Sequence, residues 1–107
     1  MRVISYEEVE AKEVKEGFKL KIRWLNTAGS KNFSVRLFEI EPGGYSPYHN
    51  HPWEHEIFVL EGNGTVIGNE GAEAISVGNI ISIPGEETHQ IKNPGKSTLK
   101  LLCMIPK

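Results

Sequence analysis

The sequence is short of several features that define whole classes of protein. It holds a single cysteine, Cys103, among 107 residues. No disulfide can therefore form within the chain, and a reducing cytoplasm is the expected compartment. The longest apolar runs, such as residues 101–105, fall far short of the ~20 residues that cross a bilayer as a helix. Residues 1–7 lack the apolar segment of a secretory signal. These absences predict a cytoplasmic protein with no membrane partner.

A strong excess of one charge is also missing. Twelve Lys and Arg against fourteen Asp and Glu give a formal net charge of −2, without the basic face or arm that binding to nucleic acid needs. Charged residues gather in residues 7–16, and we expect residues 1–17 to form a solvated N-terminal arm or an edge strand. No linker or change of composition divides the chain, so residues 1–107 are predicted to form one domain.

Glycine and proline, by contrast, are frequent. Eleven glycines and six prolines separate short segments in which apolar and polar residues alternate, as in half-buried strands. The predicted strands cover residues 18–24, 33–41, 56–61, 65–67, 72–77, 80–83 and 98–105. A loop is expected at residues 26–30, and Pro42-Gly43-Gly44 is expected to end the second strand. With no long helical pattern, the expected fold is all-β, a small antiparallel double-sheet β-barrel or jelly roll.

The four histidines are the residues most indicative of chemistry. His49, His51 and His55 lie within seven residues, and His89 comes from a separate strand region. Residues two apart on an extended chain share a face, and neutral imidazole is a good ligand for first-row divalent metals. A His-x-His pair alone is a weak signal, because surface and core histidines also occur at that spacing. Convergence of all four would place one ion inside the barrel.

The histidines stand in two longer patterns. The first is Gly43-x5-His49-x-His51-x3-His55-x6-Gly62, and the second is Gly78-x5-Pro84-x4-His89-x3-Asn93. These segments, residues 43–62 and 78–93, resemble the two signature motifs of the cupin superfamily. The resemblance implies a single-domain cupin, with four metal ligands: His49, His51, His55 and His89.

Two positions depart from the cupin motifs. Glu86 stands where the second motif has glycine, and His55 stands where most cupins have a glutamate ligand. A fourth neutral imidazole leaves the charge of the dication undiminished, which favours anionic ligands. The segment 51–60 resembles that of small single-domain cupins that bind manganese through four histidines. The resemblance thus implies manganese or iron, although raw affinity favours copper, nickel or zinc. Manganese is the predicted metal, with iron, zinc, nickel and copper as alternatives.

Strand parity also predicts which side chains lie near the metal. The side chains expected to point inward are Leu99, Leu101, Cys103, Ile105, Ile57, Val59 and Ile91. Trp24 is expected in the core. The catalytic candidates are Tyr48 and Cys103 as bases, and Arg36 as the group that holds a substrate carboxylate. Plainer interpretations stay open: Cys103 as a core residue, Arg36 facing solvent, and Tyr48 covering the end of the barrel.

Three functions are compatible with these features. The first is a metal-dependent oxidoreductase of dioxygenase type acting on a small molecule. The second is a non-catalytic module that binds or senses a small ligand, and the third is a structural metal site. Phe58 and Leu60 have the parity of outward-facing residues, where a second copy of the chain would bury them. A homodimer is therefore expected, as is usual in cupins.

Overall fold

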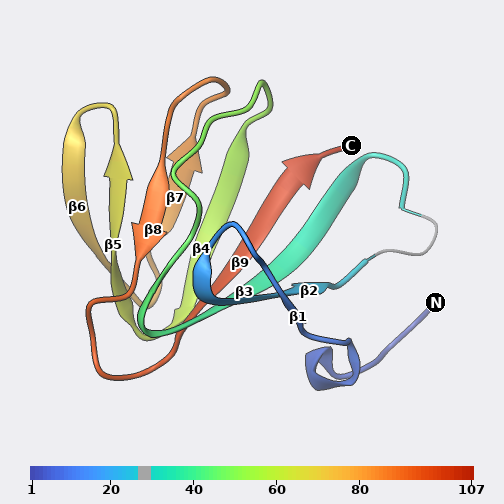
Figure 1. Cartoon of the computed structure of the whole chain (residues 1–107). Coiled ribbons are helices and arrows are strands. Elements are labelled where there is room, and N and C mark those ends of the chain that lie inside the picture. The colour runs from blue at the N-terminus through green and yellow to red at the C-terminus, as the bar shows by residue number, and fades with distance from the viewer. Residues whose placement is uncertain (27–29) are drawn as a thin grey trace.

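Nine β-strands and one short 3-10 helix form the described part of the chain, residues 1–26 and 30–107, in this computed structural model (Figure 1). They are η1 (Tyr6–Glu8), β1 (Lys12–Glu13), β2 (Phe18–Trp24), β3 (Phe33–Tyr45), β4 (His55–Glu61), β5 (Asn63–Gly68), β6 (Gly71–Ser76), β7 (Ile80–Ile83), β8 (Gln90–Lys92) and β9 (Leu99–Pro106). The predicted loop at residues 26–30 lies largely outside the described residues. Within those residues, no helix has the length and apolar character needed to cross a membrane.

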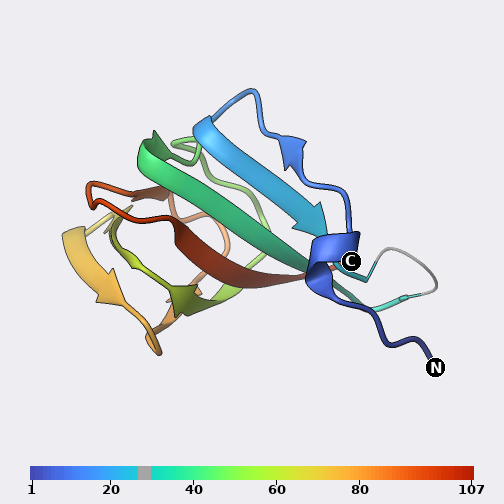
Figure 2. The same ribbon diagram turned by 90° about the horizontal axis from the view of Figure 1, so that it is seen from below.

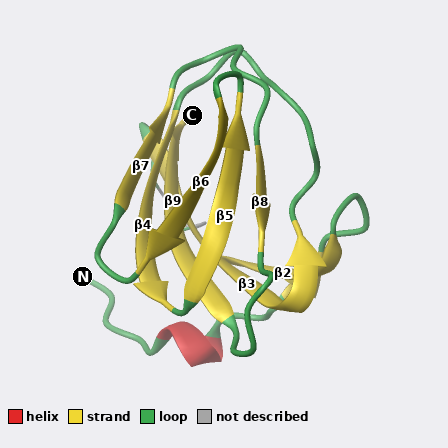
Figure 3. Ribbon diagram, turned by 90° about the vertical axis from the view of Figure 1, so that its left-hand side faces the viewer, coloured by secondary structure: helices red, strands yellow, loops and turns green. Residues whose placement is uncertain are grey.

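The strands form one antiparallel sheet that curls so that its two ends face each other. Their order is β6-β5-β8-β3-β9-β4-β7, with β2 along the other edge of β3 and β1 along β2. Figure 3 shows β5, β6 and β8 in front of β3 and β9. Curling buries the apolar face of the sheet against itself. The all-β prediction, a small antiparallel barrel of jelly-roll type, is confirmed.

Strand β2 matches its prediction, but β3 is longer than predicted. Pro42-Gly43-Gly44 does not end β3, which continues to Tyr45. The register between β2 and β3 shifts here, because Phe18 pairs with Tyr45 while Leu20 pairs with Ile40. A bulge of this kind accommodates extra residues and a proline that cannot donate to the ladder. Gly43 has φ +86°, a conformation that side chains disfavour.

The N-terminal segment lies along the outer edge of the sheet (Figure 2). Lys12 and Glu13 of β1 pair with Ile22 and Lys21 of β2. The turn after β1 is closed by the backbone N–H of Val14, which donates to the carbonyl oxygen of Leu20 at 3.0 Å. The charged segment therefore adds a short edge strand to its own chain.

Most parity predictions for the core are confirmed. Leu99, Leu101 and Cys103 are at most 1% exposed. Asn93 is equally buried, and its side-chain amide donates to the carbonyl oxygens of Ile40 and Ser97. Trp24 is the exception, because it ends β2 at the rim of the sheet and is 37% exposed. The prediction that it lies in the core is wrong.

Phe58 and Leu60 on β4 are 38% and 44% exposed. Both side chains therefore point outward, as predicted. Burial of these residues by a second copy of the chain stays a prediction.

Candidate metal centre

The concave face of the sheet holds a pocket of about 510 Å³. Strands β2, β3, β4, β8 and β9 supply its walls, which are mostly apolar: Leu20, Ile22, Phe38, Ile40, Ile57, Ile91 and Leu101. All four histidines line the same pocket. A ligand in this pocket would therefore meet aliphatic walls and imidazole rings together.

Three of the histidines form a compact cluster. His49 and His89 exchange backbone hydrogen bonds across an isolated β-bridge, with N···O distances of 3.2 and 2.9 Å. The ring of His51 lies 5.1 Å from that of His49 and 5.2 Å from that of His89, between centroids. One ring nitrogen from each of the three lies within 4.8 Å of the others. The His-x-His spacing and the bridge to His89 together create the cluster.

Backbone carbonyl groups orient two of these rings. Nδ1 of His89 lies 2.9 Å from the carbonyl oxygen of Glu87, and Nδ1 of His51 lies 3.2 Å from that of Trp53. Because a carbonyl oxygen only accepts, each Nδ1 carries the proton and donates. Each Nε2 is then unprotonated and has its lone pair available. This hydrogen-bonding pattern is typical of histidines that bind metals.

His55 lies beside the cluster but outside the group of three. Its Nε2 is 2.7 Å from Nε2 of His51, and the two rings stack with centroids 4.3 Å apart. Since Nε2 of His51 is unprotonated, Nε2 of His55 must donate the hydrogen bond. To act as a fourth ligand through that atom, His55 would have to move its proton to Nδ1. The structure thus shows a three-histidine cluster in place of the expected four-histidine set.

The surroundings of His49, His51 and His55 favour the neutral form of these three imidazoles. Burial lowers the pKa of His49, and the nearby His89, His51 and Arg36 lower it further. Burial also lowers the pKa of His51, against the opposing effect of its hydrogen bond to Trp53. For His55, burial and then the neighbouring His51 and Arg36 lower the pKa to about 3. Neutral imidazole is the form that binds a metal.

Two of the three catalytic candidates lie in the pocket. Arg36 points inward, and its Nη2 donates to Sγ of Cys103 at 3.1 Å. The same sulfur lies 3.3 Å from Nδ1 of His55. Burial raises the pKa of the Cys103 thiol, so this group remains protonated at neutral pH. Tyr48 is 64% exposed and is not among the residues that line the pocket.

Trp53 flanks the histidines in the sequence, a position compatible with the rim of a pocket or with the end of the barrel. It stacks on His51 with centroids 4.4 Å apart and the planes 5° from parallel, and it lines the pocket. Val14 and Glu16, which the sequence pattern did not indicate, also line the pocket, from the turn between β1 and β2. They lie in an irregular turn, where strand parity offers no guide.

The cluster fits a divalent metal ion. At a metal–imidazole distance of ~2.1 Å, neighbouring ligand nitrogens of one ion lie about 3.0 to 3.4 Å apart. The three nitrogens lie within 4.8 Å of one another, so they would have to draw together around a bound ion. Neutral imidazole suits zinc, copper, iron and nickel, so the donor set alone does not select one metal.

Fold and cluster together define a class, that of small β-barrel proteins with histidines converging in a central pocket. The chain belongs to the cupins: the family model described as Cupin domain (Cupin_2) matches residues 36–105. The matched segment contains all four histidines, Arg36 and Cys103.

Proteins similar to this chain have diverse functions. It is 32% identical over 71 residues to the 1-methylthio-D-xylulose 5-phosphate methylsulfurylase of Rhodospirillum rubrum, covering 66% of this chain and 46% of that protein. It is 33% identical over 86 residues to auxin-binding protein 1 of Arabidopsis thaliana, covering 72% and 43%. The chain thus spans less than half the length of these curated relatives.

A solved structure matches over almost the whole chain. The polyketide cyclase RemF from Streptomyces resistomycificus is 30% identical, with a TM-score of 0.92. The match covers 99% of this chain and 79% of that one.

Proposed function

We propose that this chain is a metal-dependent enzyme that acts on an apolar small molecule bound in the pocket. The observation that carries this proposal is the position of the cluster. His49, His51 and His89 line the same pocket as the aliphatic side chains. A structural metal site has no need of an adjoining pocket of about 510 Å³, whereas small-molecule sites are typically apolar clefts with a few polar groups.

The three histidines would hold the ion, with His55 as a fourth ligand after its change of tautomer. We propose manganese as the native metal, as the cupin resemblance implies, with iron, zinc, nickel and copper as alternatives. A bound manganese or iron ion would supply a Lewis acid for an oxygen of the substrate and a path for electrons to dioxygen.

The chain's own residues have three tasks in this proposal. The aliphatic walls exclude water from the substrate and so strengthen polar interactions at the cluster. The carbonyl groups of Glu87 and Trp53 keep His89 and His51 oriented. The Cys103 thiol, protonated at neutral pH, donates a hydrogen bond to Nδ1 of His55 while Nε2 of that ring carries the imidazole proton. Cys103 is thus a donor in this state rather than the base that the sequence suggested.

The proposed reaction is an oxidation with dioxygen. A second candidate is ring closure of a polyketide-like substrate without oxidation. The match to the cyclase RemF favours this second reaction, because it extends over 99% of the chain at 30% identity. Both reactions need an apolar pocket beside a metal ion that acts as a Lewis acid, but only the oxidation consumes dioxygen.

Elemental analysis of protein purified without added metal tests the proposal first. We expect about one transition-metal ion per chain in the wild type, and almost none in the His49→Ala/His51→Ala variant. Asn50→Ala is the matched control, because Asn50 lies between the two histidines but bonds to Thr88. Equal metal contents in the wild type and the double variant would contradict the proposal.

Uptake of dioxygen by the metal-loaded protein, with apolar enols and polyketide mimics as probes, then separates the two reactions. Uptake that depends on the probe supports oxidation, whereas product without uptake supports ring closure. Bound probe with no product in either assay would indicate a binding module.

A further inference from the structure

Arg36 lines the pocket and forms no ion pair with any residue that the structure describes. Its guanidinium carbon lies 5.4 Å from the ring centroid of Trp24 and 5.0 Å from that of Phe38. Nη2 donates to the sulfur of Cys103, while Nε is buried and has no hydrogen-bond partner. Among the described residues, no oxygen atom accepts a hydrogen bond from this side chain.

Among the described residues, no ion pair compensates the charge of Arg36; Glu16 also lines the pocket, but it is exposed in the turn between β1 and β2 and forms no hydrogen bond or ion pair with the guanidinium. The ion pairs found in residues 1–26 and 30–107 involve Arg23 and Lys100, and none of them reaches Arg36. The two aromatic rings hold the guanidinium in place, but they supply no counter-charge. Removing a cation from water is unfavourable unless an anion accompanies it. A divalent ion at the neighbouring histidines would add further positive charge.

We propose that the pocket takes an apolar organic carboxylate, whose carboxylate group is bound by the guanidinium of Arg36 beside the histidine cluster. This inference rests on the proposed function and specifies its substrate class. A guanidinium offers N–H donors in a plane that matches a carboxylate. One arginine balances one negative charge, and the aliphatic walls suit the rest of such a molecule.

Calorimetric titration with two matched probes tests the inference. 2-Naphthoate carries a carboxylate, whereas 2-naphthamide is nearly the same shape and has no charge. We expect wild-type protein, as purified, to bind the naphthoate at least tenfold more tightly than the naphthamide. Arg36→Met should remove that preference and leave naphthamide binding unchanged, and Arg36→Lys should retain part of it. Lys21→Met is the control, because it removes an exposed cation from β2 outside the pocket.

Equal binding of the two probes by the wild type would overturn the inference, and this comparison requires no variant to fold. A preference that survives in folded Arg36→Met would overturn it as well. Measuring the metal content of every sample distinguishes a failure of this inference from a failure of the proposed function. A charge preference that depends on Arg36 in protein without metal would support the carboxylate site while contradicting the metal-dependent enzyme.

Discussion

Two arginines on neighbouring strands have opposite surroundings. Arg23 on β2 faces the outer side of the sheet, where its Nε donates to Glu39 at 2.7 Å and its Nη1 donates to the carbonyl oxygen of Val9 at 2.7 Å. Arg36 on β3 faces the pocket, where the acceptor found for it in the described part of the chain is the sulfur atom of Cys103. Arg23 thus has its charge balanced and holds the N-terminal segment against the sheet. We therefore expect Arg36 to contribute less to the stability of the fold than Arg23, and to be available to a ligand.

The largest expected effect is the difference in stability between the Arg23→Met and Arg36→Met variants. Arg23→Met should destabilise the fold by about 2 kcal/mol, because it removes charged hydrogen bonds to Glu39 and to backbone carbonyls. The melting temperature should then fall by roughly 10 °C. Arg36→Met should leave stability unchanged or raise it, since methionine keeps the apolar stem and removes an uncompensated cation. Thermal unfolding followed by circular dichroism measures both variants.

Similar melting temperatures of the two variants would contradict this comparison of Arg23 with Arg36. A large loss in Arg36→Met would mean that its stacking on Trp24 and Phe38, and its contact with Cys103, support the fold. Arg36 would then be a structural residue like Arg23.

The sequence predicted the outer face and the pocket unequally well. Strand β2 alternates cleanly, so its bounds and its buried residues Leu20 and Ile22 followed from the period of two. Strand β3 has apolar residues on both faces: Leu37 is 2% exposed on the outer side, while Phe38 lines the pocket. Parity alone could not decide which of these faces is internal, and the direction of Arg36 stayed open for that reason.

The candidate site was predictable in position but not in detail. Motif spacing placed His49, His51 and His89 together, because residues two apart share a face and the two motifs pair. Which ring nitrogen of His55 carries the proton depends on atoms of Cys103 and His51, and only the folded chain brings these atoms together. The partners of Arg23 lie on the N-terminal segment, whose path no local pattern determines.

The pocket face of the sheet should be more sensitive to acid than the outer face, because all four histidines line the pocket. The folded state lowers the pKa of His55 from 6.5 to about 3. Between these values the unfolded chain binds more protons than the folded one, so stability is full above pH 6.5 and declines as the pH falls toward 3. We expect the melting temperature of metal-free protein to fall by roughly 5 °C between pH 6.5 and 5.

His55→Gln should reduce this acid dependence, since glutamine does not titrate. Measurements between pH 6.5 and 5 avoid most of the protonation of carboxylates. An acid dependence as steep in His55→Gln as in the wild type would place the responsible group elsewhere, and His49 and His51 would be the next variants to measure.

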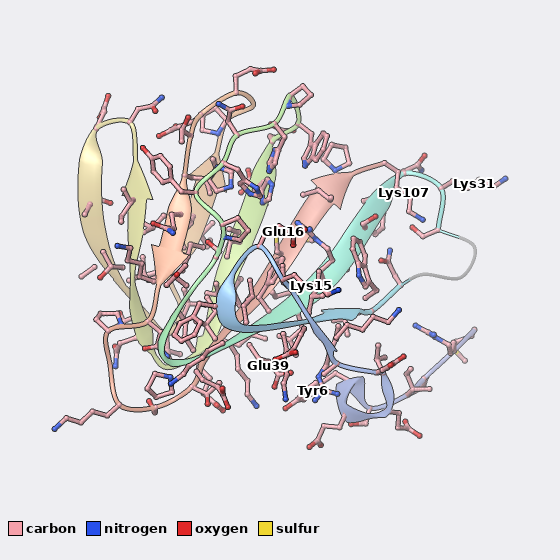
Figure 4. All side chains as sticks on the ribbon, in the orientation of Figure 1. Tyr6, Lys15, Glu16, Lys31, Glu39 and Lys107 are labelled. Atoms are coloured by element: carbon pink, nitrogen blue, oxygen red, sulfur yellow. The ribbon has the colours of Figure 1, made fainter. Side chains whose placement is uncertain are left out.

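The smallest expected effect lies at the exposed end of the outer network, where Tyr6 and Glu39 lie near each other (Figure 4). Nζ of Lys100 donates to the Tyr6 hydroxyl at 3.0 Å, and this hydrogen bond is the main cause of the raised pKa of Lys100. Its stabilising effect is therefore present at neutral pH and is lost only as the pH rises above the ordinary range of lysine. Tyr6→Phe should cost at most about 0.5 kcal/mol, because the contact is exposed. It should also return the pKa of Lys100 toward its ordinary value, which an NMR titration of the lysine side chain measures. A loss as large as that of Arg23→Met would mean that Tyr6, Lys100, Glu39 and Arg23 act as one cooperative unit on the outer face.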